Sequence, residues 1–202
     1  MKLYSNKFAP SPRRVRMFAA EKGLSLETVE IDIGAGGTQT PEYLAINPLG
    51  ETPALVRDDG SVLGESLAIC RWLEEEHPEP NLFGRTSRER ADINAWIDRL
   101  MFRLYVPTAN AFRHTHPYWA TRLEQNAAWG ESSRAAVRAE YAALNAEIGD
   151  RPFIARDTFS MADVVLYTTI DFGKPAKLRV GEGEAALKRW YDTIATRASA
   201  RV

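Results

Sequence analysis

The hydrophobic pattern of this chain changes its period near residue 78, and this change constrains the fold more than any other feature. Before it, short runs with the two-residue alternation of strands are interleaved with runs of helical spacing, and after it the spacing is helical almost to the end. Between them lies "HPEPNLFGRTS", which has the prolines, asparagine and glycine of a linker. The sequence predicts an α/β domain over 1–77, a linker over 78–87 and an all-helical domain over 88–202.

The first domain is expected to have the element order β-α-β-α-β-β-α. Ser11 is expected to cap the first helix, with Pro12 as its first residue and Gly23 after its end. Asp59-Gly60 is typical of a tight turn between two strands. The elements are expected at 2–5, 12–22, 27–33, 40–47, 53–63 (two strands) and 66–77. A strand-helix-strand unit followed by a hairpin and a helix predicts a small mixed sheet with helices packed on it.

Bulk composition excludes several classes of protein. The formal net charge of -1 argues against broad binding to nucleic acid, which favours a basic excess. No stretch approaches the roughly 20 apolar residues of a membrane span. A single cysteine, Cys70, rules out an intrachain disulfide and suits a reducing compartment, and no secretory signal is apparent, so a cytoplasmic protein is expected. His114 and His116 would not face the same way on a helix and lack a third ligand, so no metal site is expected.

Two short motifs suggest a site for a small peptide. Pro53 lacks an N–H, and if its bond to Thr52 is cis, the Thr52 backbone faces outward and can pair with an extended ligand. Glu65 and Ser66 stand where a strand meets a helix, whose first N–H groups attract a carboxylate. The Ser66 hydroxyl adds a donor, and Glu65 attracts an ammonium. Together they describe a pocket for a peptide with a free α-amino acid end.

Each of these residues also has a simpler interpretation. Ser66 is then the cap of its helix, Glu65 complements the helix dipole, and Pro53 shapes a turn. The combination of all three on this topology favours the peptide site.

The chain resembles a known family in several motifs. In the first domain these are "MKLYSNKFAPSPRRVRMFAAEKGL", "NPLGETPAL", "DDG" and "ESLAICRWLEE", and in the second domain "TFSMADVVLY". The family that they resemble is the glutathione transferase superfamily. The resemblance covers nearly the whole chain, and it is closest to bacterial and fungal members. It implies a thioredoxin-like domain, an all-α domain, a homodimer and glutathione as co-substrate. By the same resemblance Thr52 would pair with the cysteinyl backbone, and Glu65 and Ser66 would hold the γ-glutamyl end. Gln39 would lie near the glycyl end, whereas Glu51 departs from the Lys or Gln of many members.

The resemblance also requires a group that ionises the glutathione thiol, whose pKa is about 8.5 when free. No cysteine lies near the end of the first strand, and Ala9 stands where serine-type members keep their serine. Ser11 is the best candidate for the thiol contact, helped by the helix N-terminus. Asn110 and His114 share one helix face and offer a second source. The alternative for His114 is a helix-end residue that complements the dipole.

We therefore expect transfer of the glutathione thiolate to a small hydrophobic electrophile. The alternatives are a glutathione-dependent peroxidase or disulfide reductase, and a related protein that binds partners without catalysis. Four aromatic residues of the second domain are candidates for the electrophile pocket, although core packing is an equal alternative: Phe102, Tyr105, Phe112 and Tyr118.

"TFSMADVV" has a structural explanation. Ser160 and Asp163 have the spacing of a capping box, with Phe159 and Val164 at the positions of a hydrophobic staple. The helix that follows is almost wholly apolar and is expected to be buried on all sides.

Overall fold

The computed structural model describes all 202 residues, which form two compact units. The first comprises residues 1–82 and 198–202, and the second comprises residues 83–197. The sequence assigned the last five residues to the helical domain, but they pack with the first unit. Arg13 donates from Nη2 to the Ala200 carbonyl at 2.9 Å, and the Ser199 hydroxyl donates to Glu21. These contacts hold the end of the chain on the first helix.

A mixed four-stranded sheet organises the first unit, with the strand order β2-β1-β3-β4. The strands are β1 (Lys2–Ser5), β2 (Glu27–Glu30), β3 (Ala54–Val56) and β4 (Val62–Leu63). β1 pairs parallel with β2 and antiparallel with β3, and β3 and β4 form the predicted hairpin. Leu3 and Leu55, on the two central strands, are fully buried. The predicted mixed sheet is confirmed.

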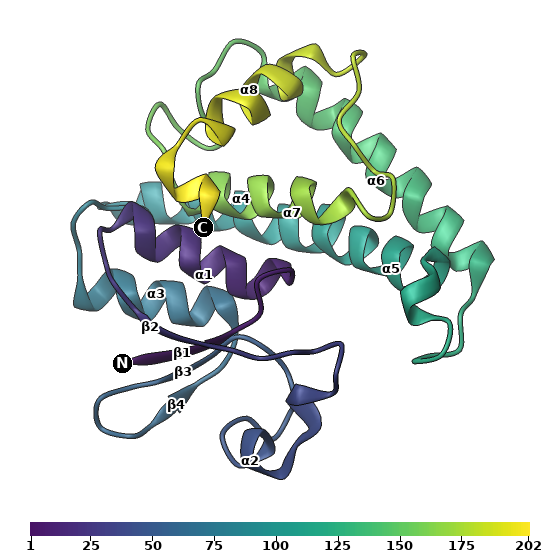
Figure 1. The fold of residues 1–202 in the computed structure, drawn as a ribbon. Helices are drawn as coiled ribbons and strands as arrows, with labels where there is room; N and C mark the ends of the chain where they lie inside the picture. Colours follow the sequence, from purple (N-terminus) through teal and green to yellow (C-terminus); the bar gives the residue numbers. More distant parts are fainter. The chain divides into compact units, whose positions relative to one another are not determined.

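Three helices complete this unit: α1 (Pro10–Glu21), α2 (Pro41–Leu44) and α3 (Ser66–Glu76). α1 and α3 pack together on one face of the sheet (Figure 1). The elements follow one another along the chain in the predicted order β-α-β-α-β-β-α. β2 is shorter than the predicted 27–33, because the chain bends after one further bond, from the Ile31 N–H to the Ser5 carbonyl at 2.7 Å. The Gly37 N–H then closes a turn onto the Asp32 carbonyl at 2.8 Å.

The start of α1 differs from the prediction. The helix begins at Pro10 and its N-cap is Ala9, so Ser11 is the second helical residue rather than the cap. Pro10 suits the first position because it has a fixed φ and no N–H to leave unpaired. The Asn6 Oδ1 accepts the N–H groups of Phe8 and Ala9, both at 3.0 Å. Asn6 thus fixes the entry into the helix.

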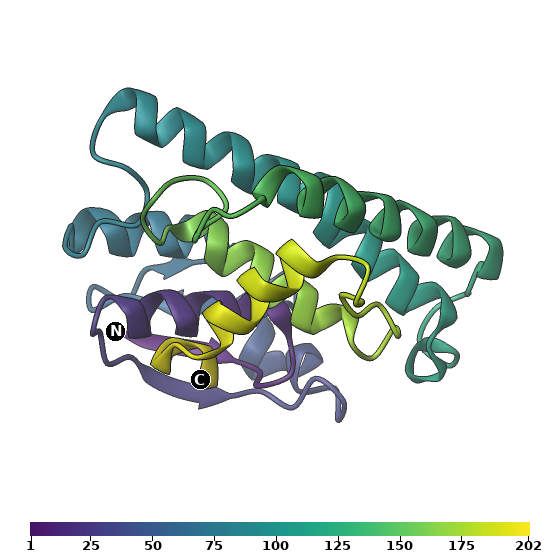
Figure 2. The same cartoon turned by 90° about the horizontal axis from the view of Figure 1, so that it is seen from above.

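The second unit is helical. Its main elements are α4 (Ser87–Leu100), a π-helical turn (Met101–Tyr105), α5 (Val106–Thr115), α6 (Ala127–Ile148), α7 (Met161–Gly173) and α8 (Ala185–Ala195). α4 and α5 continue one another through the π-helical turn, and α6 runs back alongside α5 (Figure 2). Pro107 explains the turn, because a proline has no N–H for the carbonyl four residues earlier and would clash with it. None of these helices has both the length and the apolar sequence needed to cross a bilayer.

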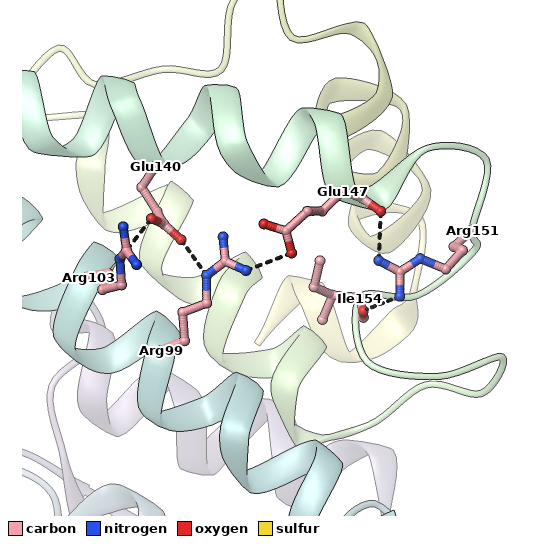
Figure 3. A network of polar contacts seen from close by, with 6 residues as sticks. All are labelled: Arg99, Arg103, Glu140, Glu147, Arg151 and Ile154. Atoms are coloured by element: carbon pink, nitrogen blue, oxygen red, sulfur yellow. Dashed lines mark hydrogen bonds and ion pairs between the residues drawn. The ribbon is translucent and has the colours of Figure 1, made fainter.

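An ion-pair network joins α4 and the π-helical turn to α6 (Figure 3). The Glu140 side chain is 3% exposed and forms ion pairs with Arg99 Nε at 2.8 Å and with Arg103 Nε at 3.3 Å. Arg99 also contacts Glu147 Oε2 at 2.7 Å. Arg151 extends the network by donating to the carbonyls of Glu147 and Ile154 at 2.8 and 3.0 Å. A buried carboxylate is tolerated only when it is compensated in this way, so the network fixes how α6 lies against α4.

α7 is the most deeply buried helix of the second unit. The capping box at Ser160 and Asp163 is confirmed, and every residue from Met161 to Ile170 is buried. Asp163 also accepts the Ile154 N–H at 2.8 Å and the Trp190 Nε1–H at 3.1 Å. Burial raises the pKa of Asp163 to about 6, although its hydrogen bonds favour the charged form. This carboxyl group ties the loop before α7 and helix α8 to one point.

We expect Asp163→Asn to alter the pH dependence of stability. Because the pKa of Asp163 is raised from 3.8 to about 6, the folded chain holds a proton between these values that the unfolded chain has lost. The stabilising contribution of this protonation is present below pH 3.8 and is lost as the pH rises through about 6. In urea unfolding, the free energy of the wild type minus that of Asp163→Asn should therefore fall across this window. Asp98→Asn, at an exposed position of α4, is the control, and an equally flat difference for both variants would contradict the expectation.

Candidate functional site

Six of the eight predicted site residues belong to the first unit, and the strand register shows how they are arranged. Leu55 pairs with Leu63, the last pair between β3 and β4, and the same register continued by two residues would bring Pro53 opposite Glu65. Tyr4 pairs with Ala54, so the chain that leaves β1 toward α1 passes the same end of β3. The start of β3, the start of α3 and the start of α1 therefore share one edge of the sheet.

The segment that leads into β3 is held from two sides. The Tyr43 hydroxyl donates to the Glu51 carbonyl at 2.6 Å, and Asn47 Nδ2 donates to the same oxygen at 2.7 Å. Burial raises the pKa of Tyr43 to about 12, so its hydroxyl remains a donor at neutral pH. Neither residue was predicted as part of the site. Together they fix the direction of the chain into Thr52.

Thr52 presents an unused backbone. Its bond to Pro53 is cis, and neither its N–H nor its C=O is bonded to another backbone group. Its Oγ1 is buried and has no hydrogen-bond partner. Backbone groups in this state are suited to an extended ligand that adds itself beside β3.

Gln39 lies against the same segment. Its Nε2 donates to the Gly50 carbonyl at 3.4 Å, and the rest of the side chain is exposed. The sequence suggested only a loop here, near one end of a bound peptide. The contact places the Gln39 side chain beside Gly50, which lies two residues before Thr52 in the sequence.

Glu65 and Ser66 form the start of α3. Glu65 is the N-cap, its side chain is exposed, and its backbone is at φ 59° and ψ 113°, a region that non-glycine residues seldom adopt. Such backbone is found preferentially at functional sites. Ser66 follows as the first helical residue and is 4% exposed. The simpler interpretation of Ser66 as the helix cap is therefore wrong, because Glu65 holds that position without a side-chain bond.

Arg14, which the sequence did not single out, is 1% exposed and donates from Nη1 to the Ser66 Oγ at 2.8 Å. Its spacing from Phe18, one helical turn further on, was the signal in the sequence that this position faces the core. The start of α3 therefore has a buried cation behind it.

Ser11 is half-buried in the first turn of α1. Of the first three residues of this helix, two are prolines without an N–H, so Ser11 supplies the only backbone donor among them. Its hydroxyl is not used as a helix cap. The start of α1 thus has Ser11 as its only residue, among the first three, with both a backbone N–H and a side-chain O–H.

Asn110 and His114 belong to α5 of the second unit, one turn apart on the same face. The His114 Nδ1 accepts the N–H of Asn126, the N-cap of α6, at 3.1 Å. A neutral imidazole bonded in this way carries its proton on Nε2 and is a donor there. His114 therefore has a structural contact at one nitrogen and an available N–H at the other.

Three of the four candidate aromatic residues take part in one aromatic cluster of the second unit. Phe112 and Tyr105 both contact Phe172, with ring centroids 5.6 and 5.9 Å apart, and Tyr118 stacks on Phe112 at 6.4 Å. Phe102 is 72% exposed and stands apart from this cluster. Tyr105, Phe112 and Tyr118 are each half-buried, so the cluster lies at the surface of the second unit and not in its core.

We expect Gly50→Ala to destabilise the chain more than Gly60→Ala. Both glycines have positive φ, 63° and 82°, so alanine at either position costs about 1 kcal/mol of backbone strain. A Cβ at Gly50 would also lie 2.4 Å from Gln39 Nε2 and 3.1 Å from the Thr38 carbonyl, whereas one at Gly60 meets nothing within 4 Å. Thermal unfolding of the two variants measures the difference. Equal melting temperatures would contradict the close approach of the Thr38 carbonyl, which cannot move aside as the flexible Gln39 side chain can.

Comparison with known proteins agrees with this architecture. The profile of the glutathione S-transferase N-terminal domain matches residues 8–76, and that of the C-terminal domain matches residues 96–198. Glutathione S-transferase 2 of Saccharomyces cerevisiae is 32% identical, over 100% of this chain and 88% of its own length. The crystal structure of Gtt2 from the same yeast superposes with a TM-score of 0.93, at 32% identity, over 100% of this chain and 99% of that one. A class Gtt2 enzyme of Vibrio parahaemolyticus is 31% identical, with a TM-score of 0.85 over 98% of this chain and 94% of that one.

These matches confirm the resemblance to fungal and bacterial members and the thioredoxin-like and helical domains that it implied. The chain belongs to the glutathione S-transferase family and is an enzyme of that type.

Proposed function

We propose that this enzyme transfers the thiolate of glutathione to a small hydrophobic electrophile. The observation that carries the proposal is the unbonded backbone of Thr52 lying, by strand register, beside Glu65 and Ser66 at the start of α3. A peptide that pairs with Thr52 as an added strand would direct its end toward the first N–H groups of α3. Ser66 then donates to the α-carboxylate of the γ-glutamyl group, and Glu65 accepts from its ammonium. Gln39 is assigned to the glycyl end.

The state of the only cysteine favours conjugation over reactions that pass through a protein thiol. Cys70 is fully buried within α3, and burial raises the pKa of its thiol above the usual range. A thiol in this state is a poor nucleophile, because the thiolate is the reactive form. A mixed disulfide between Cys70 and glutathione is therefore disfavoured.

We also propose, from family membership, that the enzyme acts as a homodimer in the cytoplasm. Cys70 is free and buried, which is compatible with a reducing compartment. Its partners are then glutathione, the electrophile and a second copy of the chain.

We expect Glu65→Gln to weaken glutathione binding about tenfold or more, because a hydrogen bond to a charged group is worth roughly 1.5–3 kcal/mol. Calorimetry with millimolar glutathione measures the affinity, and Glu75→Gln, at an exposed position of the same helix, is the control. Conjugation of chlorodinitrobenzene should fall in parallel. Peroxide and disulfide reduction assays distinguish the alternative activities. A wild type that gives no binding heat would refute the proposal, and binding without turnover in any assay would favour a non-catalytic relative.

We further infer that the lowered pKa of the bound thiol is divided between Ser11 and the Asn110/His114 face of α5. Ser11→Ala removes one donor and should reduce turnover partially. At His114 the two nitrogens can be tested separately, because asparagine can keep an acceptor near the Nδ1 position and glutamine a donor near the Nε2 position. His114→Asn should lower turnover and keep the melting temperature, whereas His114→Gln should do the reverse, because it loses the contact with the Asn126 N–H.

Titration of the thiolate by its ultraviolet absorbance reads the pKa of bound glutathione directly. The double variant Ser11→Ala/His114→Asn should raise this pKa more than either change alone. If Ser11→Ala by itself abolishes the shift, the division is wrong and Ser11 alone activates the thiol. If both His114 variants change only the melting temperature, His114 is a structural residue.

A further inference from the structure

Arg14 combines deep burial with a direct contact to the proposed ligand site. Its side chain is among the largest that are fully buried, yet it carries a permanent positive charge. Nη1 donates to the Ser66 Oγ at 2.8 Å. The charge also reaches the next turn of α3, since it opposes the rise that burial causes in the pKa of Cys70. The guanidinium therefore lies behind the first turn of α3.

The three arginines of α1 have different partners. Arg13 bonds the Ala200 carbonyl, and Arg16 donates to the Ser5 hydroxyl and to the Asn6 carbonyl, at 2.5 and 3.1 Å. Arg14 bonds Ser66, a residue at the start of α3. The contact is thus a property of this position and not of a basic helix face.

The contact determines what the Ser66 hydroxyl can do. A hydroxyl has one proton and two lone pairs, and here one lone pair is taken by Arg14. The Ser66 proton remains to be donated, and a charge-assisted bond to the oxygen strengthens that donation. A hydroxyl polarised in this way at a helix N-terminus favours an anionic acceptor over a neutral one.

The charge itself acts in the same direction. Screening by water is weak at 1% exposure, so the positive potential of the guanidinium extends to the first turn of α3. A carboxylate bound at the start of α3 would bring negative charge close to Arg14 without touching it. Binding of an anion there is stabilised by the guanidinium through both the Ser66 hydroxyl and the local potential.

We propose that Arg14 is a positioning residue that sets the preference of this site for the α-carboxylate of the γ-glutamyl group. It acts by fixing Ser66 as a donor and by placing positive charge behind it. The inference rests on the proposed function, because the carboxylate is that of bound glutathione.

The test compares three peptides. Glutathione carries the α-carboxylate and the ammonium, 4-aminobutanoyl-cysteinylglycine lacks the carboxylate, and glutaryl-cysteinylglycine lacks the ammonium. Arg14→Gln keeps a neutral donor and removes the charge. It should weaken the binding of glutathione and of the glutaryl peptide about tenfold or more, and it should change the affinity for the 4-aminobutanoyl peptide by less than about twofold. Arg14→Lys keeps the charge, so its affinity for glutathione should lie between those of the wild type and Arg14→Gln.

The control is Lys22→Gln at the other end of α1. Lys22 Nζ is also buried, 2.7 Å from Glu74 Oε2 and 2.7 Å from the Pro80 carbonyl, so its loss removes a comparable buried cation away from Ser66. It should lower the melting temperature and leave the ratio of the three affinities unchanged. In the pair Arg14→Gln and Ser66→Ala, the two losses should not add, because Arg14 acts partly through Ser66.

Calorimetry of all variants with the three peptides decides the matter. An equal loss for every peptide would show that Arg14 only supports the fold, and unchanged affinities would show that it has no influence on the site. Either result overturns the inference while the proposed function stands. If the wild type binds none of the peptides, both the inference about Arg14 and the proposed function are refuted. If Arg14→Gln does not fold, Arg14→Lys is judged by the same ratio, and loss of selectivity for the carboxylate is the supporting result.

Discussion

The antiparallel pairing of β1 with β3 is the contact on which the candidate site depends. β1 is an inner strand of the sheet, and its register with β3 places Tyr4 opposite Ala54. This pairing determines which end of β3 lies beside the chain that leaves β1 for α1, and the hairpin then brings the start of α3 to the same edge. Segments from three parts of the first unit are thereby brought together by main-chain hydrogen bonds, which form whatever the side chains of the strands are.

Buried charges supply the specificity that the sheet lacks. Lys22 pairs with Glu74 between α1 and α3, Glu140 is held by two arginines, and Asp163 accepts bonds from three segments of the second unit. Each of these groups is costly to bury alone, so a shifted packing would leave a charge uncompensated. Arg14 belongs to this class, but its partner Ser66 lies at the proposed ligand site. In that case the arrangement that specifies the fold also prepares the site for an anion.

Local sequence signals predicted the elements well where one signal dominated. The Asp59-Gly60 turn, the capping box at Ser160 and the order of strands and helices in the first unit are confirmed, because each depends on residues adjacent in the chain. The prediction failed at the start of α1, where two prolines compete for the first helical position and the side chain of Asn6, three residues before the N-cap Ala9, decides the entry. It also extended β2 beyond Glu30, since alternation continues in the sequence after the pairing partner β1 has ended.

The sequence by itself therefore determined the family, the element order and the motifs at Thr52 and Glu65-Ser66, since these are written in short contiguous stretches. Only the tertiary structure decided that Arg14 is buried against Ser66 and that Tyr43 and Asn47 hold the Glu51 carbonyl. It also decided that the last five residues return to the first unit. An arginine, a tyrosine or an asparagine has no fixed partner in the one-dimensional pattern, because its long or polar side chain bonds whichever group the packing of other elements brings within reach.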